Sequence, residues 1–141
     1  MTTKQKKGDL GVCKAIADLS SQGVNVSIPI SESQGYDVIL EKNGLCKTAQ
    51  VKYCTAKANG SLQIALRSKW STKGKNNYKA RKSGKFDILV VYCPDTDECY
   101  YFLDNEFTNS HYLWIRIREP KQMQKKVRLA KEYKSVDRAF I

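Results

Sequence analysis

A nearly continuous apolar run, FDILVVYC from Phe86 to Cys93, constrains the fold of this chain more than any other segment. A run of this kind is typical of a β-strand that is buried on both faces. Such a strand belongs to a sheet that is covered on each side by other elements. The chain has 141 residues, of which 41% are apolar, enough for one core. We therefore expect a single domain over residues 1–141.

The remaining segments predict a mixed set of helices and strands. Residues 7–22 carry apolar side chains at three-to-four spacing, as an amphipathic helix does, and Gly23 follows at the position of a C-terminal cap. Asn43-Gly44 between two β-prone runs is a strong hairpin signal. We expect a basic segment without periodicity at 68–85 and an amphipathic helix at 122–134. The predicted strands are Val24–Ile30, Tyr36–Glu41, Leu45–Tyr53, Leu62–Arg67, Phe86–Cys93, Glu98–Leu103 and Tyr112–Ile117.

The charge balance points to a class of partner. Lys and Arg number 25 against 14 Asp and Glu, so the formal net charge is +11 and a polyanion is the first partner to consider. The lone histidine, His111, argues against His-based nucleases, and the five cysteines form no C-x-x-C pair for structural zinc. No apolar run approaches the ~20 residues of a membrane span, so we expect a soluble, cytoplasmic protein. Trp114 has apolar neighbours and is expected in the core.

One polar constellation follows from the predicted hairpin, which places Asp37 on one strand and Gln50 and Lys52 on its neighbour. Gln50 and Lys52 share a face because side chains alternate along a strand. Mg²⁺ takes one or two carboxylates with water and substrate phosphate, so Asp37 with the Gln50 side-chain oxygen or the Val51 carbonyl forms a candidate site. Lys52 is then placed to neutralise developing phosphate charge or to poise a water. The alternative is three polar residues on the solvated face of a hairpin.

The same order of elements resembles a known nuclease family. A helix, a strand, Tyr36-Asp37, a hairpin and then Q-V-K resemble the PD-(D/E)XK nuclease core, with Gln50 at the usual acidic position. The segments GDLG, IPISE and YCPDTDECYYF resemble the group I intron-encoded bacterial homing endonucleases of this fold. The resemblance implies a restriction-endonuclease-like α/β core, a mixed central sheet flanked by helices. It also implies that Asp37 binds metal, that Lys52 is catalytic, and that the cofactor is Mg²⁺ or another divalent cation.

One position departs from the family pattern. Family members often carry a glutamate on the first helix after G-D-x-G, and Val12 stands there in this chain. Valine neither binds a cation nor orients a water. Two explanations stay open: an inactivated or altered copy, or a site completed by another group such as Glu32.

The basic segment at about 67–85 is the candidate DNA-binding loop. It carries eight positive charges and no acidic residue, with Trp70 and Tyr78 between them. Phosphate contacts dominate affinity for DNA, and a glycine-containing basic loop is suited to follow a duplex backbone and to order on contact. The alternative is a solvated loop without a partner. The residues that we expect to bind DNA are Arg67, Lys69, Lys73, Lys75, Lys79, Arg81 and Lys82.

The leading hypothesis is a Mg²⁺-dependent, site-specific DNA endonuclease that hydrolyses both strands of a long duplex target. Cutting two strands requires two active sites and hence a homo-oligomer, and the resemblance implies a dimer or a dimer of dimers (a homotetramer). Three alternatives stay open: a catalytically impaired DNA-binding protein on the same fold, a Holliday-junction resolvase, and an RNA-binding module. Val12 favours the first of these, and the last lacks an RNP-like aromatic pattern.

Overall fold

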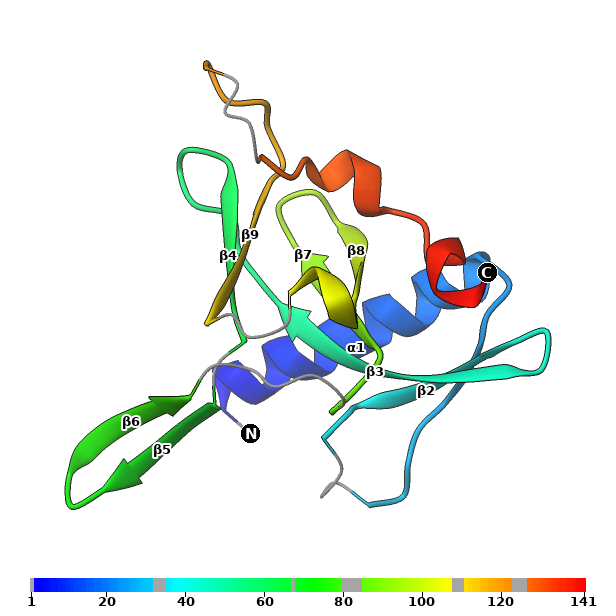
Figure 1. The fold of residues 1–141 in the computed structure, drawn as a ribbon, viewed down its shortest axis with the longest axis horizontal. Helices are drawn as coiled ribbons and strands as arrows, with labels where there is room; N and C mark the ends of the chain where they lie inside the picture. The colour runs from blue at the N-terminus through cyan, green and yellow to red at the C-terminus, as the bar shows by residue number, and fades with distance from the viewer. Residues whose placement is uncertain (1, 32–34, 67, 80–84, 108–110, 123–126) are drawn as a thin grey trace.

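A mixed five-stranded sheet forms the centre of the protein, seen in a computed structural model that describes residues 2–31, 35–66, 68–79, 85–107, 111–122 and 127–141 (Figure 1). Within 68–79, only the side chains of 73–75 are described. The strands of the sheet, in spatial order, are β1 (Asn25–Ser27), β2 (Val38–Lys42), β3 (Leu45–Tyr53), β7 (Ile88–Cys93) and β8 (Glu98–Leu103). β3 and β7 run parallel, whereas the other neighbouring pairs are antiparallel.

Helix α1 (Thr3–Ser21) covers one face of this sheet (Figure 1). It begins with a capping box, in which the Thr2 side chain accepts the Gln5 N–H and the Gln5 side chain accepts the Thr2 N–H. Gly11 is buried where α1 crosses β3, and a Cβ there would lie 3.6 Å from the Cβ of Tyr53. A small residue thus lets the helix approach the strand closely. The predicted first helix is confirmed, although its first turn precedes the predicted start.

A second, two-stranded antiparallel sheet, of β4 (Ser61–Ala65) and β9 (Tyr112–Arg116), covers the opposite face. All six residues of β7 are buried, and they alternate between the apolar cluster under α1 and the cluster under β4 and β9. The prediction of a strand buried on both faces is therefore confirmed, and so is the α/β class with a mixed central sheet. The cluster under β4 and β9 contains Leu62, Ile64, Phe86, Leu89, Val91, Cys93, Tyr100, Phe102, Phe107, Leu113, Ile115 and Ala130.

Residues 68–79 form a hairpin, not the aperiodic segment expected from the sequence. β5 (Ser68–Thr72) and β6 (Lys75–Lys79) pair antiparallel in a separate two-stranded sheet, which projects away from the other layers in Figure 1. Lys73 and Gly74 join them with φ angles of 49° and 77°, the positive values of a two-residue hairpin turn. Lys-Gly is a weaker turn signal than Asn-Gly. Each flanking run has a single aromatic residue and otherwise polar ones, so no apolar alternation predicted the strands.

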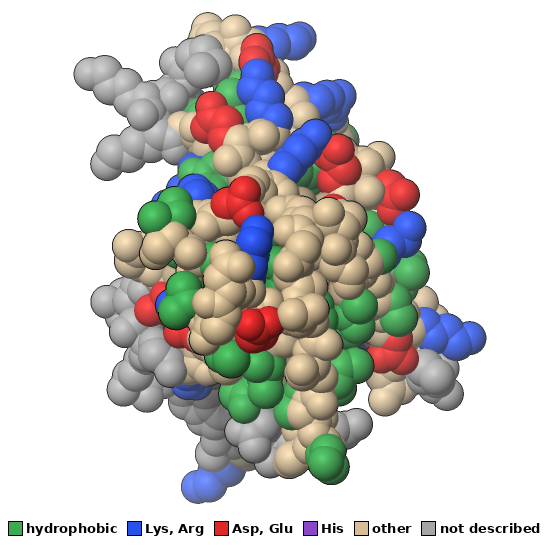
Figure 2. Space-filling view, turned by 90° about the vertical axis from the view of Figure 1, so that its right-hand side faces the viewer, with side chains coloured by type: hydrophobic (Ala, Val, Ile, Leu, Met, Phe, Trp, Pro, Cys, Tyr) green, Lys and Arg blue, Asp and Glu red, His purple; other side chains and the backbone are tan. Residues whose placement is uncertain are grey.

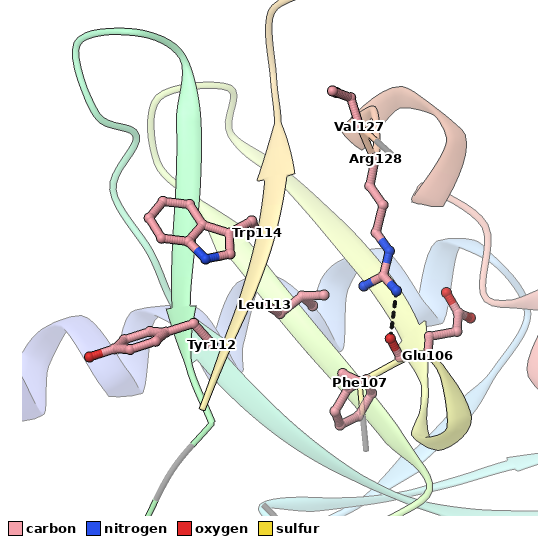
Figure 3. Close-up of a pocket in the computed structure, with 7 residues that line it drawn as sticks. All are labelled: Glu106, Phe107, Tyr112, Leu113, Trp114, Val127 and Arg128. Carbon is pink, nitrogen blue, oxygen red and sulfur yellow. Dashed lines mark hydrogen bonds between the residues drawn. The ribbon is translucent and has the colours of Figure 1, made fainter. Parts of the chain in front are cut away.

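The amphipathic α-helix predicted at 122–134 is wrong over the described part of that range, where only Ala130–Tyr133 is helical, as a short 3₁₀ helix. Leu129 forms a parallel bridge with Arg116, whose N–H donates to the Arg128 carbonyl at 2.9 Å. The Arg128 guanidinium donates to the carbonyl oxygen of Glu106 at 2.6 Å (Figure 3). The chain therefore runs along the edge of β9 at Arg128 and Leu129. This pairing satisfies backbone groups on the edge of β9, which would stay unpaired if the segment were helical.

The helical structure beyond α1 is limited to short turns in the described part of the chain. None of the described helices is both long and apolar enough to cross a membrane. The 3₁₀ helices are η1 (Asp104–Glu106), η2 (Ala130–Tyr133) and η3 (Asp137–Phe140).

Trp114 lies outside the core, contrary to the expectation from its apolar neighbours. Its side chain is 51% exposed, whereas Leu113 and Ile115 on either side of it are buried. Figure 3 shows the indole on the opposite side of β9 from Leu113. The reason is the alternation of side chains along a strand, since only one face of the β4–β9 sheet packs on the central sheet.

Candidate active site

The C-terminal half of β3 has a neighbouring strand on one side only. β7 pairs with β3 as far as Tyr53, whereas the pairing with β2 ends at Val38 opposite Ala49. The backbone edge of residues 50–53 that faces β2 is therefore uncovered by any strand of the described chain. Such an edge offers N–H and C=O groups to a ligand or to a side chain. The polar residues singled out from the sequence lie at this edge.

Asp37 occupies the position where β2 stops pairing. Its N–H donates to the Ala49 carbonyl at 2.9 Å, and its Oδ2 accepts the Val51 N–H at 2.8 Å. Continuing the register of β2 and β3 by one step places Asp37 opposite Gln50. The carboxylate is exposed and yet held by the backbone of β3, so its position is fixed without a second side chain.

Gln50 and Lys52 lie on the same side of β3. Ala49, Val51 and Tyr53 pack in the apolar cluster under α1, so the alternate residues Gln50 and Lys52 belong to the opposite face. Both side chains are half-buried. On β2, Val38 and Leu40 also belong to the cluster under α1, which assigns Asp37 to the same face as Gln50 and Lys52. The predicted hairpin thus brings all three residues to one face and one edge.

Lys52 is desolvated beside an opposite charge and a like charge. Burial lowers the pKa of its ammonium group, the Asp37 carboxylate acts in the opposite direction, and the charge of Lys4 adds to the lowering. A cavity of about 410 Å³ opens next to it. The cavity is lined by Thr3, Lys4, Lys7 and Gly8 of α1 and by Val51, Lys52 and Tyr53 of β3.

The oxygen donors at this edge fit a hard divalent cation better than a transition metal. No group of three or more His, Cys, Asp or Glu side chains is placed to hold a metal within the described residues. The donors present are the Asp37 carboxylate, the Gln50 amide oxygen and the Val51 carbonyl, which points toward the same edge as the Val51 N–H. Mg²⁺ needs only one or two carboxylates, with waters and substrate phosphate completing its shell. The set therefore fits Mg²⁺.

Val12 contributes packing where a family member often has a glutamate. It is half-buried and packs against the apolar cluster under α1. A valine there adds no donor to the edge of β3. Glu32, the alternative acidic group, lies outside the described residues.

The residues expected to contact DNA are distributed over the β5–β6 hairpin and its flanks. Lys73 and Lys75 are exposed at its turn, and Lys69 and Lys79 belong to its two strands. Arg67, Arg81 and Lys82 lie outside the described residues. The hairpin therefore gathers four of the predicted lysines on one projecting element, apart from the central sheet.

The opposite end of the molecule is balanced in charge. Figure 2 views the end that carries the β2–β3 turn and the C-terminus, and shows basic and acidic side chains interspersed there. Ion pairs tie the C-terminal segment to the rest of the chain: Lys42–Asp137 at 3.0 Å, Lys134–Glu98 at 2.8 Å and Arg138–Glu106 at 2.7 Å. The positive surplus is therefore not concentrated on this end.

Sequence reasoning missed two residues of the site, Lys4 and Lys7. They lie in the first two turns of α1 and reach the cavity because the helix crosses the open edge of β3. Lys4 and Lys7 lie seven and four residues before the buried Gly11, a spacing that puts them on the same side of the helix as Gly11. The spacing could have predicted that Lys4 and Lys7 face the sheet, but only if the helix were known to begin at Thr3.

Known proteins share this sequence pattern and this architecture. The family model described as PD-(D/E)XK endonuclease matches residues 1–136. A solved structure of a bacterial homing endonuclease, I-Ssp6803I, superposes with a TM-score of 0.74 at 20% identity, covering 94% of this chain and 88% of that one. No curated protein matches. The structural likeness confirms the predicted restriction-endonuclease-like fold, and the match over nearly the whole sequence shows that this chain belongs to the PD-(D/E)XK endonuclease family.

Proposed function

We propose that the protein is a site-specific, Mg²⁺-dependent DNA endonuclease of the homing type, which hydrolyses both strands of a long duplex target. Family membership supplies the nuclease class. The finer statement depends on the residues at the open edge of β3, on the basic hairpin and on the resemblance of the sequence to homing endonucleases. The solved homing endonuclease with the same fold agrees with this choice.

The observation that carries the proposal is the fixed position of Asp37. Its Oδ2 lies 2.8 Å from the Val51 nitrogen, on the same face and edge as Gln50 and Lys52. A carboxylate held by a backbone N–H needs no reorganisation when a cation and a phosphate arrive. Preorganised polar groups of this kind supply much of the rate enhancement in phosphoryl chemistry.

Asp37, Gln50 and the Val51 carbonyl would hold the divalent cation. When bound, the cation supplies charge neutralisation and an activated water for phosphodiester hydrolysis. Lys52 binds a non-bridging phosphate oxygen through its ammonium group and balances the negative charge that develops there. Its partial burial strengthens that interaction, because a charge acts more strongly where water is partly excluded.

The proposed DNA contacts are argued from charge, and the proposed second active site is argued from symmetry. The β5–β6 hairpin is suited to enter a groove of DNA, because a two-stranded ribbon fits the major groove. Lys73 and Lys75 at its exposed turn would bind phosphates. Cutting both strands requires two copies of the site, so the active species is a symmetric dimer or a dimer of dimers.

A cleavage assay on a random-sequence duplex library, with Mg²⁺ and with EDTA, tests the proposal. The native protein should cut at one recurrent site with Mg²⁺ only. Lys52→Ala should abolish cleavage while the variant still binds duplex, with the loss of no more than one phosphate contact. Lys47→Ala, on the same strand but in the paired half of β3, is the matched control and should cut as the native protein does. Equal cleavage by Lys52→Ala, or undiminished cleavage in EDTA, would exclude this mechanism.

Val12 favours a second candidate, a DNA-binding protein that has lost its nuclease activity. The test is Val12→Glu in the same assay, because a glutamate restores the acidic group common in the family. Cleavage by Val12→Glu alone would identify the native chain as a binding protein. Preference for four-way junctions over linear duplex at equal salt would instead indicate a resolvase.

A further inference from the structure

A group of three lysines surrounds the cavity beside the open edge of β3. Lys4 and Lys7 come from α1, and Lys52 comes from β3. Lys7 is held in place by the ring of Tyr53, with its Nζ 5.8 Å from the ring centroid. The proposed catalysis uses Lys52 alone, so it leaves Lys4 and Lys7 without a role.

This grouping is unfavourable for the protein by itself. Lys4, Lys7 and Lys52 line one cavity of about 410 Å³, and Lys52 is half-buried there, so three like charges share a partly enclosed space. The Asp37 carboxylate partly balances the charge of Lys52, but the first turn of α1 contains no acidic residue that would compensate Lys4 and Lys7. Like charges gathered beside a cavity are typical of sites that bind the opposite charge. The missing counter-charge is therefore expected from an anion that occupies the cavity.

Other lysines of the same helix differ from this pair. Lys14 forms an ion pair with Asp97 at 2.8 Å, so its charge is already balanced. Lys6 does not line the cavity, and its position two residues from Lys4 turns it toward the other side of α1. Of the several lysines of α1, Lys4 and Lys7 are therefore the pair that lines the cavity.

We propose that Lys4 and Lys7 form a second phosphate subsite, which binds the DNA backbone phosphate adjacent to the scissile one. The inference rests on the proposed function and extends it to a part of the chain outside the basic hairpin. A strand whose scissile phosphate lies at Asp37, Gln50 and Lys52 continues along the open edge of β3 into the cavity. Lys4 and Lys7 are positioning residues, since they hold the strand in register and do not touch the reacting atoms.

The salt dependence of DNA binding tests this subsite without requiring cleavage. Affinity for a random-sequence duplex is measured in EDTA over a range of salt for the native protein, Lys4→Gln, Lys7→Gln and the double variant. Each lost phosphate contact should lower the slope of log K against log salt by about 0.9, hence by about 1.8 for the double variant. Lys6→Gln removes the same charge from the same turn of α1 and should leave the slope unchanged. Lys4→Arg/Lys7→Arg should restore the native slope.

The outcomes separate this subsite from the proposed nuclease function. Thermal unfolding by circular dichroism establishes that each variant is folded before binding is compared. If the native protein cuts DNA but Lys4→Gln and Lys7→Gln bind as Lys6→Gln does, the subsite is wrong and the nuclease stands. If the variants have a lower salt slope of DNA binding while the native protein never cuts, the subsite is correct and the protein is a DNA-binding protein. If the native protein does not bind duplex DNA, both are wrong.

Discussion

The Asp37 carboxylate accepts the Val51 N–H at 2.8 Å, and this single contact joins the end of one strand ladder to the candidate catalytic edge. β2 no longer pairs with β3 beyond Ala49, so the side chain of Asp37 takes over the role of a strand neighbour. We propose the same carboxylate as a ligand of the divalent cation. One residue therefore contributes both to the stability of β3 and to the proposed chemistry, and substitutions can separate the two contributions.

Asp37→Asn should remove activity and preserve the fold. The amide oxygen of asparagine still accepts the Val51 N–H, whereas the negative charge that a cation needs is lost. Even the outer partners of a metal ligand are worth about 10–100-fold, so we expect cleavage to fall by at least about 100-fold. Asp37→Ala should also lower the free energy of unfolding by about 1 kcal/mol, because the N–H loses its acceptor. Urea unfolding and cleavage rates measure both effects, and native-like cleavage by Asp37→Asn would contradict the metal-ligand role.

The part of this site that the sequence predicted depends on local signals. Asn43-Gly44 defines the turn, and the turn defines the register that brings Asp37 opposite Gln50. β3 and β8 match the predicted ranges residue for residue, because each is bounded by a recognisable turn. The catalytic roles of Asp37, Gln50 and Lys52 stay predictions, since their arrangement alone does not test them.

The parts that the sequence did not predict depend on tertiary contacts. The extended course of Leu129 is determined by its bridge to Arg116, which no pattern of spacing within 122–134 contains. The contribution of Lys4 to the cavity depends on the docking of α1 across the open edge of β3, where Gly11 allows close approach. The β5 and β6 sequences, SKWST and KNNYK, each hold one aromatic residue among polar ones, so they carry no apolar alternation to read.

Two equivalent turns permit a matched test of the β5–β6 hairpin. Gly44 and Gly74 have φ angles of 82° and 77°, and an added Cβ would meet no atom within 4 Å at either position. Replacement by alanine therefore costs only the conformational penalty of a positive φ, about 1–2 kcal/mol. Gly44→Ala should lower the free energy of unfolding, because its turn belongs to the central sheet. Gly74→Ala should leave global unfolding unchanged and weaken binding to duplex DNA.

Denaturant unfolding and DNA titrations of both variants provide the measurement for these turns. If Gly44→Ala and Gly74→Ala weaken DNA binding to the same extent, the β5–β6 hairpin has no special part in the DNA interface. If Gly74→Ala lowers the unfolding midpoint as much as Gly44→Ala does, the hairpin is part of the cooperative core.

Tyr101→Phe should destabilise the packing of α1 on β8. The Tyr101 hydroxyl, on a fully buried side chain, donates a hydrogen bond to the Asp18 carboxylate. Burial and this hydrogen bond raise the pKa of Tyr101. Hydrogen bonds to charged groups are worth about 1.5–3 kcal/mol, so we expect a loss of that order in the free energy of unfolding. Tyr133→Phe is the control: that ring stacks on Phe102 at 4.7 Å, and the change should cost less than about 0.5 kcal/mol. Equal effects in urea unfolding would contradict the role of the hydroxyl.

Asp97 links α1 to the turn between β7 and β8 through charge, and this link should make stability depend on pH. Its Oδ1 accepts a hydrogen bond from Lys14 at 2.8 Å and another from the Tyr92 hydroxyl at 2.7 Å. The hydrogen bond from Lys14, then that from Tyr92, lowers the pKa of Asp97 below its ordinary value of 3.8. Since the folded state binds the proton more weakly than the unfolded state, the stabilisation is present above pH 3.8 and is lost as the pH falls through the folded pKa.

Asp97→Asn isolates this effect, because asparagine tolerates the positive φ of 51° at this position as aspartate does. The native protein should unfold at a higher temperature than the variant at neutral pH, and the difference should vanish in acid, below the folded pKa. At alkaline pH the stability changes with pH in the opposite direction. The hydrogen bond to Asp97 is the main cause that raises the pKa of Tyr92 from 10.0 to about 12, so its stabilisation is lost as the pH rises from 10 toward 12. Thermal unfolding of both proteins from acid to alkaline pH measures the two limbs, and a difference that does not change with pH would show that the carboxylate carries no such linkage.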